Sequence, residues 1–135
     1  MRLLRIDHVG VVVPGFAEPA ALLEALGLEL GRTNRNDESL AHYYPCGDAS
    51  IELIEVHDPE ARARRLPEGA QAVIEHIAVE VDDLGAVRDL LTARGVTVSW
   101  PPFPSGAAMM IWTDAATSGG VQYQFLIRPE PPEAA

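Results

Sequence analysis

Two similar stretches, IDHVGVVV at residues 6–13 and IEHIAVEV at residues 74–81, decide the fold of this chain. When each residue n is placed beside residue n+68, Ile6 aligns with Ile74 and His8 with His76 without a gap. The same offset aligns later apolar positions and places Gly27 beside Gly95. The chain therefore contains one structural module twice.

Each copy predicts the order strand, helix, strand, strand, strand. A β-branched run is followed by apolar positions at helical spacing and then by a glycine typical of a helix end. We expect helices at about 18–26, with Ala21, Leu22, Ala25 and Leu26 on one apolar stripe, and at about 84–93, with Asp82 or Asp83 as its N-cap. The strands after the helices are LELGRT, LAHYYP and SIELIEV in the first copy and VTVSW, AAMMIWT and VQYQFLI in the second.

These boundaries predict a single α+β domain spanning residues 1–135. Module one covers about 5–57, a connector with about one helical turn covers 58–73, and module two covers about 74–128. Residues 129–135 form a Pro-rich tail that we expect to be flexible.

The charge composition excludes several classes of function. The chain carries 10 basic and 20 acidic residues, for a net charge of -10, and all of its cations are arginines. Without lysine, a Schiff-base mechanism and a lysine-containing phosphate loop are excluded. The acidic balance disfavours nucleic acid and anionic membranes, so we expect a small-molecule ligand. The single cysteine and the absence of a long apolar segment favour a cytoplasmic protein.

Strand alternation sorts the side chains onto two faces. His8 shares a face with Gly10, and His76 shares one with Ala78, whereas the neighbouring valines point to the opposite face, which the helices should cover. The small residues beside each histidine leave space for a ligand. In the closing strands, Glu52, Gln122 and Gln124 fall on the face of the histidines.

The set His8, Glu52, His76 and Gln124 takes two residues from each module. Two imidazoles, a carboxylate and an amide oxygen suit a divalent ion such as Zn, Co, Ni, Mn or Fe. A buried Glu52 also needs a cation, a metal or a hydrogen-bond donor nearby. The alternative is a polar, water-filled cleft whose hydrogen bonds are satisfied without an ion.

These residues resemble the vicinal oxygen chelate superfamily, the group of glyoxalase I, bleomycin-resistance proteins, extradiol dioxygenases and methylmalonyl-CoA epimerases. The resemblance runs from Ile6 to Arg128 and is nearest to the epimerases. It rests on IDHVGVVV, SIELIE, EHIAVEVDDL, ARGV and TSGGVQYQFL, in that order. It implies two βαβββ modules forming a curled mixed sheet around one cavity, helices on its outer face, a metal at the base of the cavity, and a homodimer.

The resemblance also assigns roles to individual residues. The family's ligand order of His, Gln, His, Glu falls on His8, Glu52, His76 and Gln124, so the second and fourth types are exchanged in this chain. Epimerisation needs an acid and a base on opposite faces of the reacting carbon. Because Gln124 cannot accept a proton, the catalytic candidates are Glu52 and, near the family's second acid, Asp37 and Glu38.

The function that this resemblance implies is a metal-dependent isomerase or lyase that stabilises the enolate of a small carbonyl or acyl-thioester substrate, such as an acyl-CoA. Gly10, Ala78, Met110, Trp112 and Gln122 are the candidate cavity residues. Three alternatives remain within the same fold: a binding or resistance protein without chemistry, a glyoxalase I-like lyase, and an extradiol dioxygenase.

Overall fold

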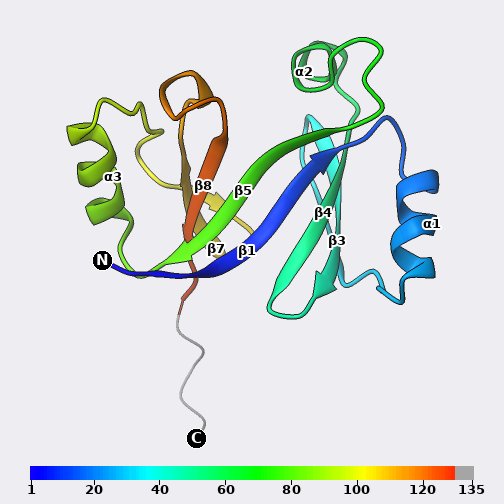
Figure 1. The fold of residues 1–135 in the computed structure, drawn as a ribbon, viewed down its shortest axis with the longest axis horizontal. Helices are drawn as coiled ribbons and strands as arrows, with labels where there is room; N and C mark the ends of the chain where they lie inside the picture. Colours follow the sequence, from blue (N-terminus) through cyan, green and yellow to red (C-terminus); the bar gives the residue numbers. More distant parts are fainter. Residues whose placement is uncertain (130–135) are drawn as a thin grey trace, which may run out of the picture. The chain divides into compact units, whose positions relative to one another are not determined.

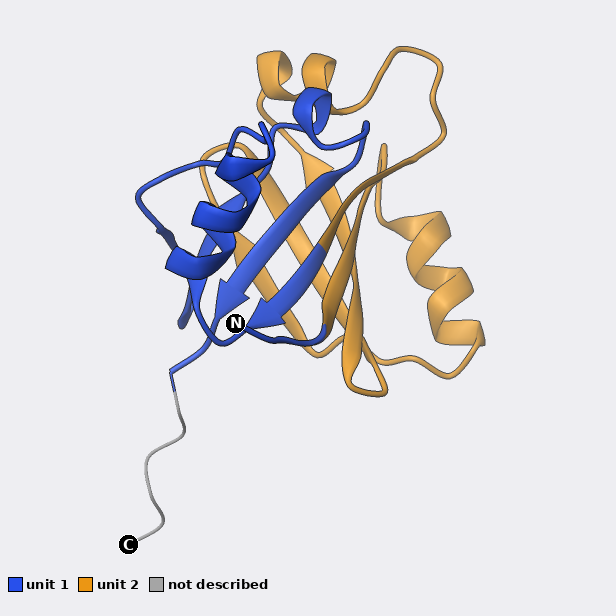
Figure 2. Ribbon diagram, turned by 60° about the vertical axis from the view of Figure 1, so that its left-hand side comes forward, with its two compact units in different colours: residues 1–5, 78–135 blue, residues 6–77 orange. Residues whose placement is uncertain are grey.

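The computed structural model describes residues 1–129 and divides into two compact units (Figures 1 and 2). Unit 2 is Ile6–Ile77, and unit 1 combines Met1–Arg5 with the chain from Ala78 onward. The predicted tail lies outside the described residues, apart from Pro129. None of the described helices has the length and apolar character needed to span a membrane.

The first copy of the module forms β1 (Leu3–Val12), α1 (Ala17–Ala25), β2 (Arg32–Arg35), β3 (Ser39–Cys46) and β4 (Ala49–Val56). Helix α2 (Pro59–Arg65) then leads into the second copy, which forms β5 (Val73–Val81), α3 (Leu84–Ala93), β6 (Phe103–Ser105), β7 (Ala108–Trp112) and β8 (Gln122–Ile127). A short 3-10 helix, η1 (Ala115–Thr117), precedes β8. The α+β class and the two βαβββ modules are therefore confirmed.

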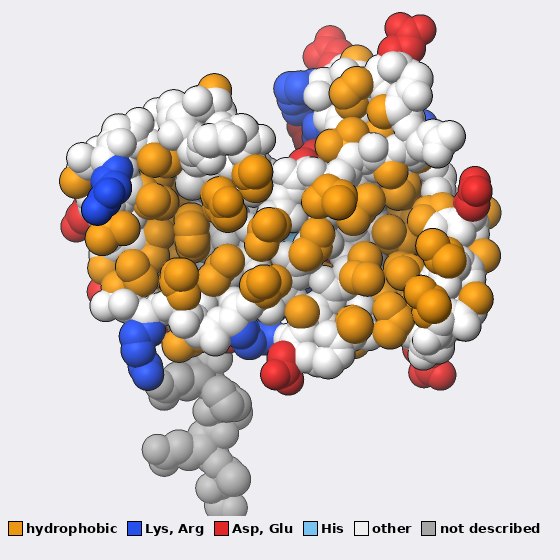
Figure 3. All heavy atoms as spheres, viewed as in Figure 1, with side chains coloured by type: hydrophobic (Ala, Val, Ile, Leu, Met, Phe, Trp, Pro, Cys, Tyr) orange, Lys and Arg blue, Asp and Glu red, His pale blue; other side chains and the backbone are white. Residues whose placement is uncertain are grey.

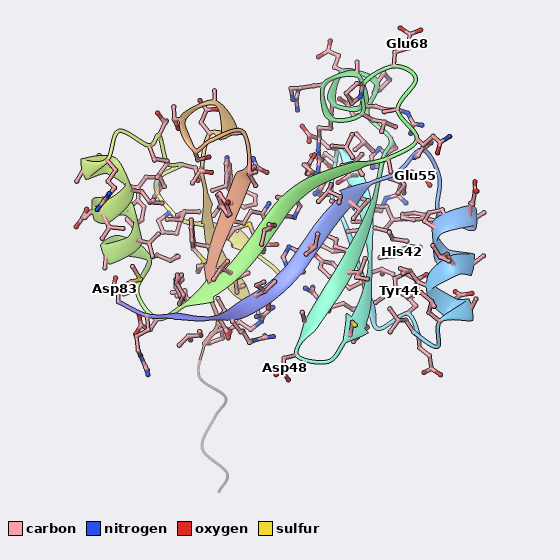
Figure 4. The ribbon with its side chains drawn as sticks, viewed as in Figure 1. His42, Tyr44, Asp48, Glu55, Glu68 and Asp83 are labelled. Atoms are coloured by element: carbon pink, nitrogen blue, oxygen red, sulfur yellow. The ribbon has the colours of Figure 1, made fainter. Side chains whose placement is uncertain are left out.

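In unit 2, neighbouring strands follow the order β2, β3, β4, β1, β5. Strands β1 and β4 are parallel, while β3 is antiparallel to both β2 and β4. One face of these strands packs with α1 through a cluster of Val13, Leu23, Tyr44 and Leu53. His42 and Tyr44 extend toward α1 in Figure 4, and the His42 ring stacks on Phe16 at 3.9 Å between centroids. The opposite face carries His8 and Glu52.

The predicted apolar stripe of α1 is wrong. Leu23 is the buried residue, with Ala20 and Phe16 packed beside it, whereas Leu22 and Leu26 are 63% and 73% exposed. Phe16, Ala20 and Leu23 lie at spacings of four and three, so they share the inward side of the helix, whereas Leu22 and Leu26 lie on another side. Exposed apolar side chains are visible over this part of the chain in Figure 3.

In unit 1, strands follow the order β5, β8, β7, β6. Helix α3 packs on them through Val81, Leu84, Val87, Ile111 and Phe125. Its N-cap is Asp83, whose side chain accepts from the backbone N–H of Ala86 at 3.0 Å. The predicted helix at 84–93 is therefore confirmed, with one of its two candidate caps.

Two strand predictions fail at their boundaries. VTVSW forms only a single bridge between Val98 and Thr113 rather than a strand, and the first strand after α3 is β6. The prolines at 101 and 102 that follow it lack N–H donors for a ladder. LELGRT pairs only from Gly31, whose N–H donates to the carbonyl of Tyr43, and β2 then continues to Arg35. The enclosed cavity and the one-domain organisation stay predictions.

Candidate metal centre

Three buried side chains of unit 2 converge at one point: His8 of β1, Glu52 of β4 and His76 of β5. Oε1 of Glu52 lies 3.0 Å from Nε2 of His76 and 3.5 Å from Nε2 of His8. The two imidazoles meet edge to face with 5.3 Å between ring centroids. The structure thus brings together three of the four ligands predicted from the sequence.

Strand register explains this convergence. In the parallel pair of β1 and β4, Gly10 lies opposite Glu52, so Glu52 and the neighbouring His8 fall on the same face. Strand β5 lies on the other side of β1 and supplies His76. A one-residue shift in the register of β1 or of β4 would send His8 or Glu52 to the α1 side.

Gly10 makes room for the His76 ring. A Cβ atom built on Gly10 would overlap the imidazole of His76. The space above this glycine, which the sequence suggested for a ligand, is therefore filled by a side chain of the site itself. A residue without a side chain is needed here because the ring lies directly on the strand.

Each histidine is also held from its other nitrogen by the acidic residue that precedes it. Nδ1 of His8 lies 2.7 Å from Oδ2 of Asp7, and Nδ1 of His76 lies 3.1 Å from Oε1 of Glu75. An ionised carboxylate can only accept, so both Nδ1 atoms carry the hydrogen. This leaves the Nε2 atoms of both rings directed at Glu52.

Glu75 in turn forms a bidentate ion pair with Arg65 of α2. The guanidinium donates to both carboxylate oxygens, at 2.8 Å from Nε and 2.9 Å from Nη2. Arg65 also lies 3.5 Å from Glu38, which pairs with the more exposed Arg64 at the same distance. A chain of charged groups therefore runs from the surface at Glu38 to the buried His76.

Tyr43 of β3 holds the carboxylate at the centre. It lies opposite Glu52 in the antiparallel pair of β3 and β4, and the two side chains are hydrogen bonded. Burial and the adjacent carboxylate raise the pKa of the Tyr43 hydroxyl, so this group is the donor. The Arg32 guanidinium lies over the Tyr43 ring, 3.8 Å from its centroid.

The charges of the cluster are balanced by the proton on His76. Burial favours the neutral imidazole, but hydrogen bonds to Glu52 and Glu75 and their charges outweigh it and raise the pKa of His76 to about 9. Burial likewise opposes ionisation of Glu52 and Glu75, yet His76 and its neighbours lower both pKa values, that of Glu75 to about 2 with Arg65 as the main partner. At neutral pH His76 is therefore a cation between two carboxylates.

This donor set fits a divalent ion. A metal about 2.1 Å from each donor places neighbouring donors roughly 3.0–3.4 Å apart, which matches the separations from Glu52 to the two Nε2 atoms. Two imidazoles and one carboxylate are a common ligand set for Zn, Fe, Co and Ni. An ion here would replace the Nε2 proton of His76 and take over its balancing charge.

The other candidates from the sequence lie elsewhere. Asp37 and Glu38 sit in the turn between β2 and β3, where the Asn36 side chain accepts from the backbone N–H of Glu38. The remaining candidates all belong to unit 1: Ala78 on β5, Met110 and Trp112 on β7, and Gln122 and Gln124 on β8. Gln124 lies opposite Trp112 in the pair of β7 and β8. Its place as a fourth ligand stays a prediction.

Sequence reasoning missed Asp7, Tyr43, Arg65 and Glu75. The sequence contains one indication of two of these residues: the offset of 68 that pairs the histidines also pairs Asp7 with Glu75. Arg65 falls in the connector between the two modules, and only the fold shows that it contacts Glu75, at 2.8 Å.

Comparison with known proteins supports the same family. The model of the glyoxalase/bleomycin resistance protein/dioxygenase superfamily matches residues 7–112. The structure of methylmalonyl-CoA epimerase from Mycobacterium tuberculosis aligns with a TM-score of 0.82 at 21% identity, covering 94% of this chain and 89% of that chain. A hypothetical protein from Bacillus halodurans aligns with a TM-score of 0.80 at 22% identity, covering 96% and 98%.

A variant of methylmalonyl-CoA epimerase from Streptomyces coelicolor, in complex with 2-nitronate-propionyl-CoA, aligns with a TM-score of 0.81 at 19% identity, covering 94% of this chain and 99% of that chain. At these identities the structural likeness establishes the fold alone. No curated protein sequence matches the chain significantly. The family model nevertheless spans most of the chain, which therefore belongs to the glyoxalase/bleomycin resistance protein/dioxygenase superfamily.

Proposed function

We propose that this protein is a metal-dependent isomerase of the methylmalonyl-CoA epimerase type, acting on an acyl-thioester that is acidic at the carbon beside its carbonyl. The observation that carries the proposal is the buried cluster of His8, Glu52 and His76, whose donor atoms lie within 4.8 Å of one another. The epimerases among the structural neighbours support the substrate class, since one of them is seen with an acyl-CoA analogue.

In this proposal His8 and His76 bind the ion through Nε2, Glu52 binds it through a carboxylate oxygen, and Gln124 is the fourth ligand. The ion supplies Lewis-acid stabilisation of the enolate oxygen. Asp7 and Glu75 keep the Nδ1 hydrogens of the two rings, so Nε2 is the nitrogen that each imidazole would offer to the ion.

Proton transfer needs two groups because epimerisation removes a proton from one face of carbon 2 and returns one to the other face. Glu52 is ionised at neutral pH and is our candidate for one of them. Glu38 or Asp37 is the candidate for the second, because the amide of Gln124 acts neither as a base nor as an acid at neutral pH. Glu38 is half-exposed and paired with Arg64 and Arg65, and Arg65 also contacts Glu75 beside His76.

Two measurements test the proposal. Metal content per chain, on protein purified without a tag or chelator, is expected to be near one divalent ion and to be lost in both His8→Ala and His76→Ala. The loaded protein should then exchange the hydrogen at carbon 2 of methylmalonyl-CoA for deuterium in heavy water, as followed by NMR. Binding of no ion after incubation with Co, Mn, Ni or Zn would contradict the proposal and favour a binding protein without chemistry.

A second candidate function rests on the ligand types alone. Two histidines and one carboxylate also form the facial triad of non-haem iron oxygenases. A ring-cleaving dioxygenase would consume oxygen when the Fe(II)-loaded protein meets a catechol, whereas an epimerase would not. The same preparation therefore separates the two chemistries.

A dimer is also part of the proposal, since the family resemblance implies one. Light scattering coupled to gel filtration should give twice the mass of the 14.6 kDa chain. A monomer at micromolar concentration would remove this part of the proposal.

A further inference from the structure

The two histidines share a feature that the metal site alone does not explain. Asp7 and Glu75 occupy equivalent positions in the two modules, and each contacts Nδ1 of the histidine that follows it. Consecutive strand residues normally point to opposite faces. The two carboxylates therefore contact the imidazole rings from outside the cluster of His8, Glu52 and His76. Both carboxylates are largely buried, with Asp7 6% exposed and the Glu75 side chain 17% exposed.

The Glu75 carboxylate is positioned by a residue distant in the sequence. Arg65, at the last position of α2, contacts both of its oxygens with the planar geometry of a bidentate pair. The Arg65 side chain is only 21% exposed and lies 3.5 Å from Glu38. The orientation of the His76 ring is therefore linked through Glu75 to the placement of α2.

We propose that Glu75, held by Arg65, is a positioning residue that fixes the His76 ring with Nε2 toward the metal, and that Asp7 does the same for His8. This inference rests on the proposed function in one respect, namely that Nε2 is the ligating atom. A carboxylate on the distal nitrogen fixes the tautomer and makes the imidazole a stronger ligand. Removing such a partner typically weakens metal binding about 10- to 100-fold.

The primary test is the affinity for Zn and Co, measured by competition with a chelating indicator. Glu75→Leu removes the acceptor at similar volume and should weaken binding about 10- to 100-fold. Glu75→Gln keeps an acceptor oxygen but not the charge and should weaken it less. Arg65→Met should weaken binding in the wild-type background yet add no further loss to Glu75→Leu, because Arg65 acts only through Glu75.

Arg64→Met is the matched control. Arg64 lies on the same helix and pairs with the same Glu38, but its side chain is 66% exposed. This variant should bind metal like the wild type. An equal loss in Arg64→Met and Arg65→Met would overturn the proposal, because it would reflect the general charge of α2. If Glu75→Leu does not fold, the test uses Glu75→Gln and Arg65→Lys instead. Unchanged metal affinity in both of these variants would overturn the proposal.

A metal-free readout separates this inference from the proposed function. In 15N-labelled apoprotein, the ring Nδ1–H of His76 should give a slowly exchanging signal in the wild type and in Arg64→Met, and should be lost in Glu75→Leu. If the wild type binds no metal but Glu75→Leu still loses the Nδ1–H signal, the proposed function fails and the positioning role stands. Persistence of the signal and of tight metal binding in Glu75→Leu would overturn the positioning role alone.

Discussion

Glu52 lies between two imidazoles, and in the metal-free protein the proton on His76 balances its charge. That proton stabilises the arrangement, because an uncompensated buried carboxylate costs several kcal/mol. A metal ion and a proton are therefore alternative occupants of the same position at Nε2 of His76. Metal binding near neutral pH should release the proton that His76 holds.

The raised pKa of His76 makes the stability of the apoprotein depend on pH. The folded-state pKa of about 9 exceeds the ordinary value of 6.5, so the contribution is fully present below pH 6.5 and is lost as the pH rises toward 9. We expect the free energy of unfolding to fall by on the order of 3 kcal/mol across this window, which ends below the range where tyrosines ionise. Urea titrations at pH 6.5, 8 and 9.5 measure the change. His76→Gln should show a much shallower slope, and an equal slope would refute the assignment.

Gly10→Ala tests the close approach of the His76 ring to β1. The added methyl group overlaps the imidazole, so the ring must move away from Glu52. We expect metal affinity to fall at least tenfold and stability to fall by about 1–3 kcal/mol, the usual cost of overpacking. Gly15→Ala is the control, because nothing lies within 4 Å of a Cβ there. Equal metal affinity in the two variants would show that the ring position is not critical.

At the residue scale, the repeat and the strand alternation predicted the three buried members of the cluster. His8 and His76 share a repeat position, and of the two carboxylates in β4, Glu52 is the one that strand alternation places on the face of the histidines. The supporting residues were harder to predict for a physical reason. Contacts such as Arg65 with Glu75 depend on the direction of α2, which sequence periodicity does not specify.

Among the elements, α2 matters more to the site than its seven residues suggest. The sequence indicated only a connector with a helical turn, since Pro59 and Pro67 frame it. In the structure the Asp58 side chain accepts from the Ala61 N–H at 3.0 Å, and Pro59 begins the helix. This cap sets where α2 starts and thereby which side of it carries Arg65.

Asp58→Ala therefore tests whether α2 positions the metal centre. Loss of the cap should cost about 1 kcal/mol of stability, and it should weaken metal binding several-fold because Arg65 is no longer fixed against Glu75. Asp83→Ala is the matched control. Asp83 caps α3 of unit 1 by accepting from the N–H three residues later at the same 3.0 Å distance, so its loss should cost similar stability with no change in metal affinity. Thermal unfolding and the competition assay measure both quantities, and parallel losses of affinity would contradict a specific role for α2.

For the molecule as a whole, the duplicated module explains why the ligand candidates come in pairs. Unit 2 carries His8, Glu52 and His76, and Gln124 lies on β8 of unit 1. The resemblance to the epimerases predicts a carboxylate on that last strand and an amide on β4, the reverse of this chain. The acidic ligand therefore comes from module one in this chain, through Glu52, and from module two in the family pattern. The sequence revealed this exchange because both positions are the closing strands of their modules.

A double substitution tests this exchange across the two modules. Glu52→Gln keeps the shape of the side chain but removes the charge that faces both imidazoles, and it should weaken metal binding at least tenfold. Adding Gln124→Glu restores the ligand order of the family and should recover most of that loss, because the ion again has two imidazoles, one carboxylate and one amide. Exchange at carbon 2 should rise in the double variant, since the last strand then carries a group that can accept a proton. Gln122→Glu, two residues earlier on the same strand, is the control for added charge. A double variant that binds metal no better than Glu52→Gln would remove Gln124 from the ligand set and leave the three residues of unit 2 as the whole protein site.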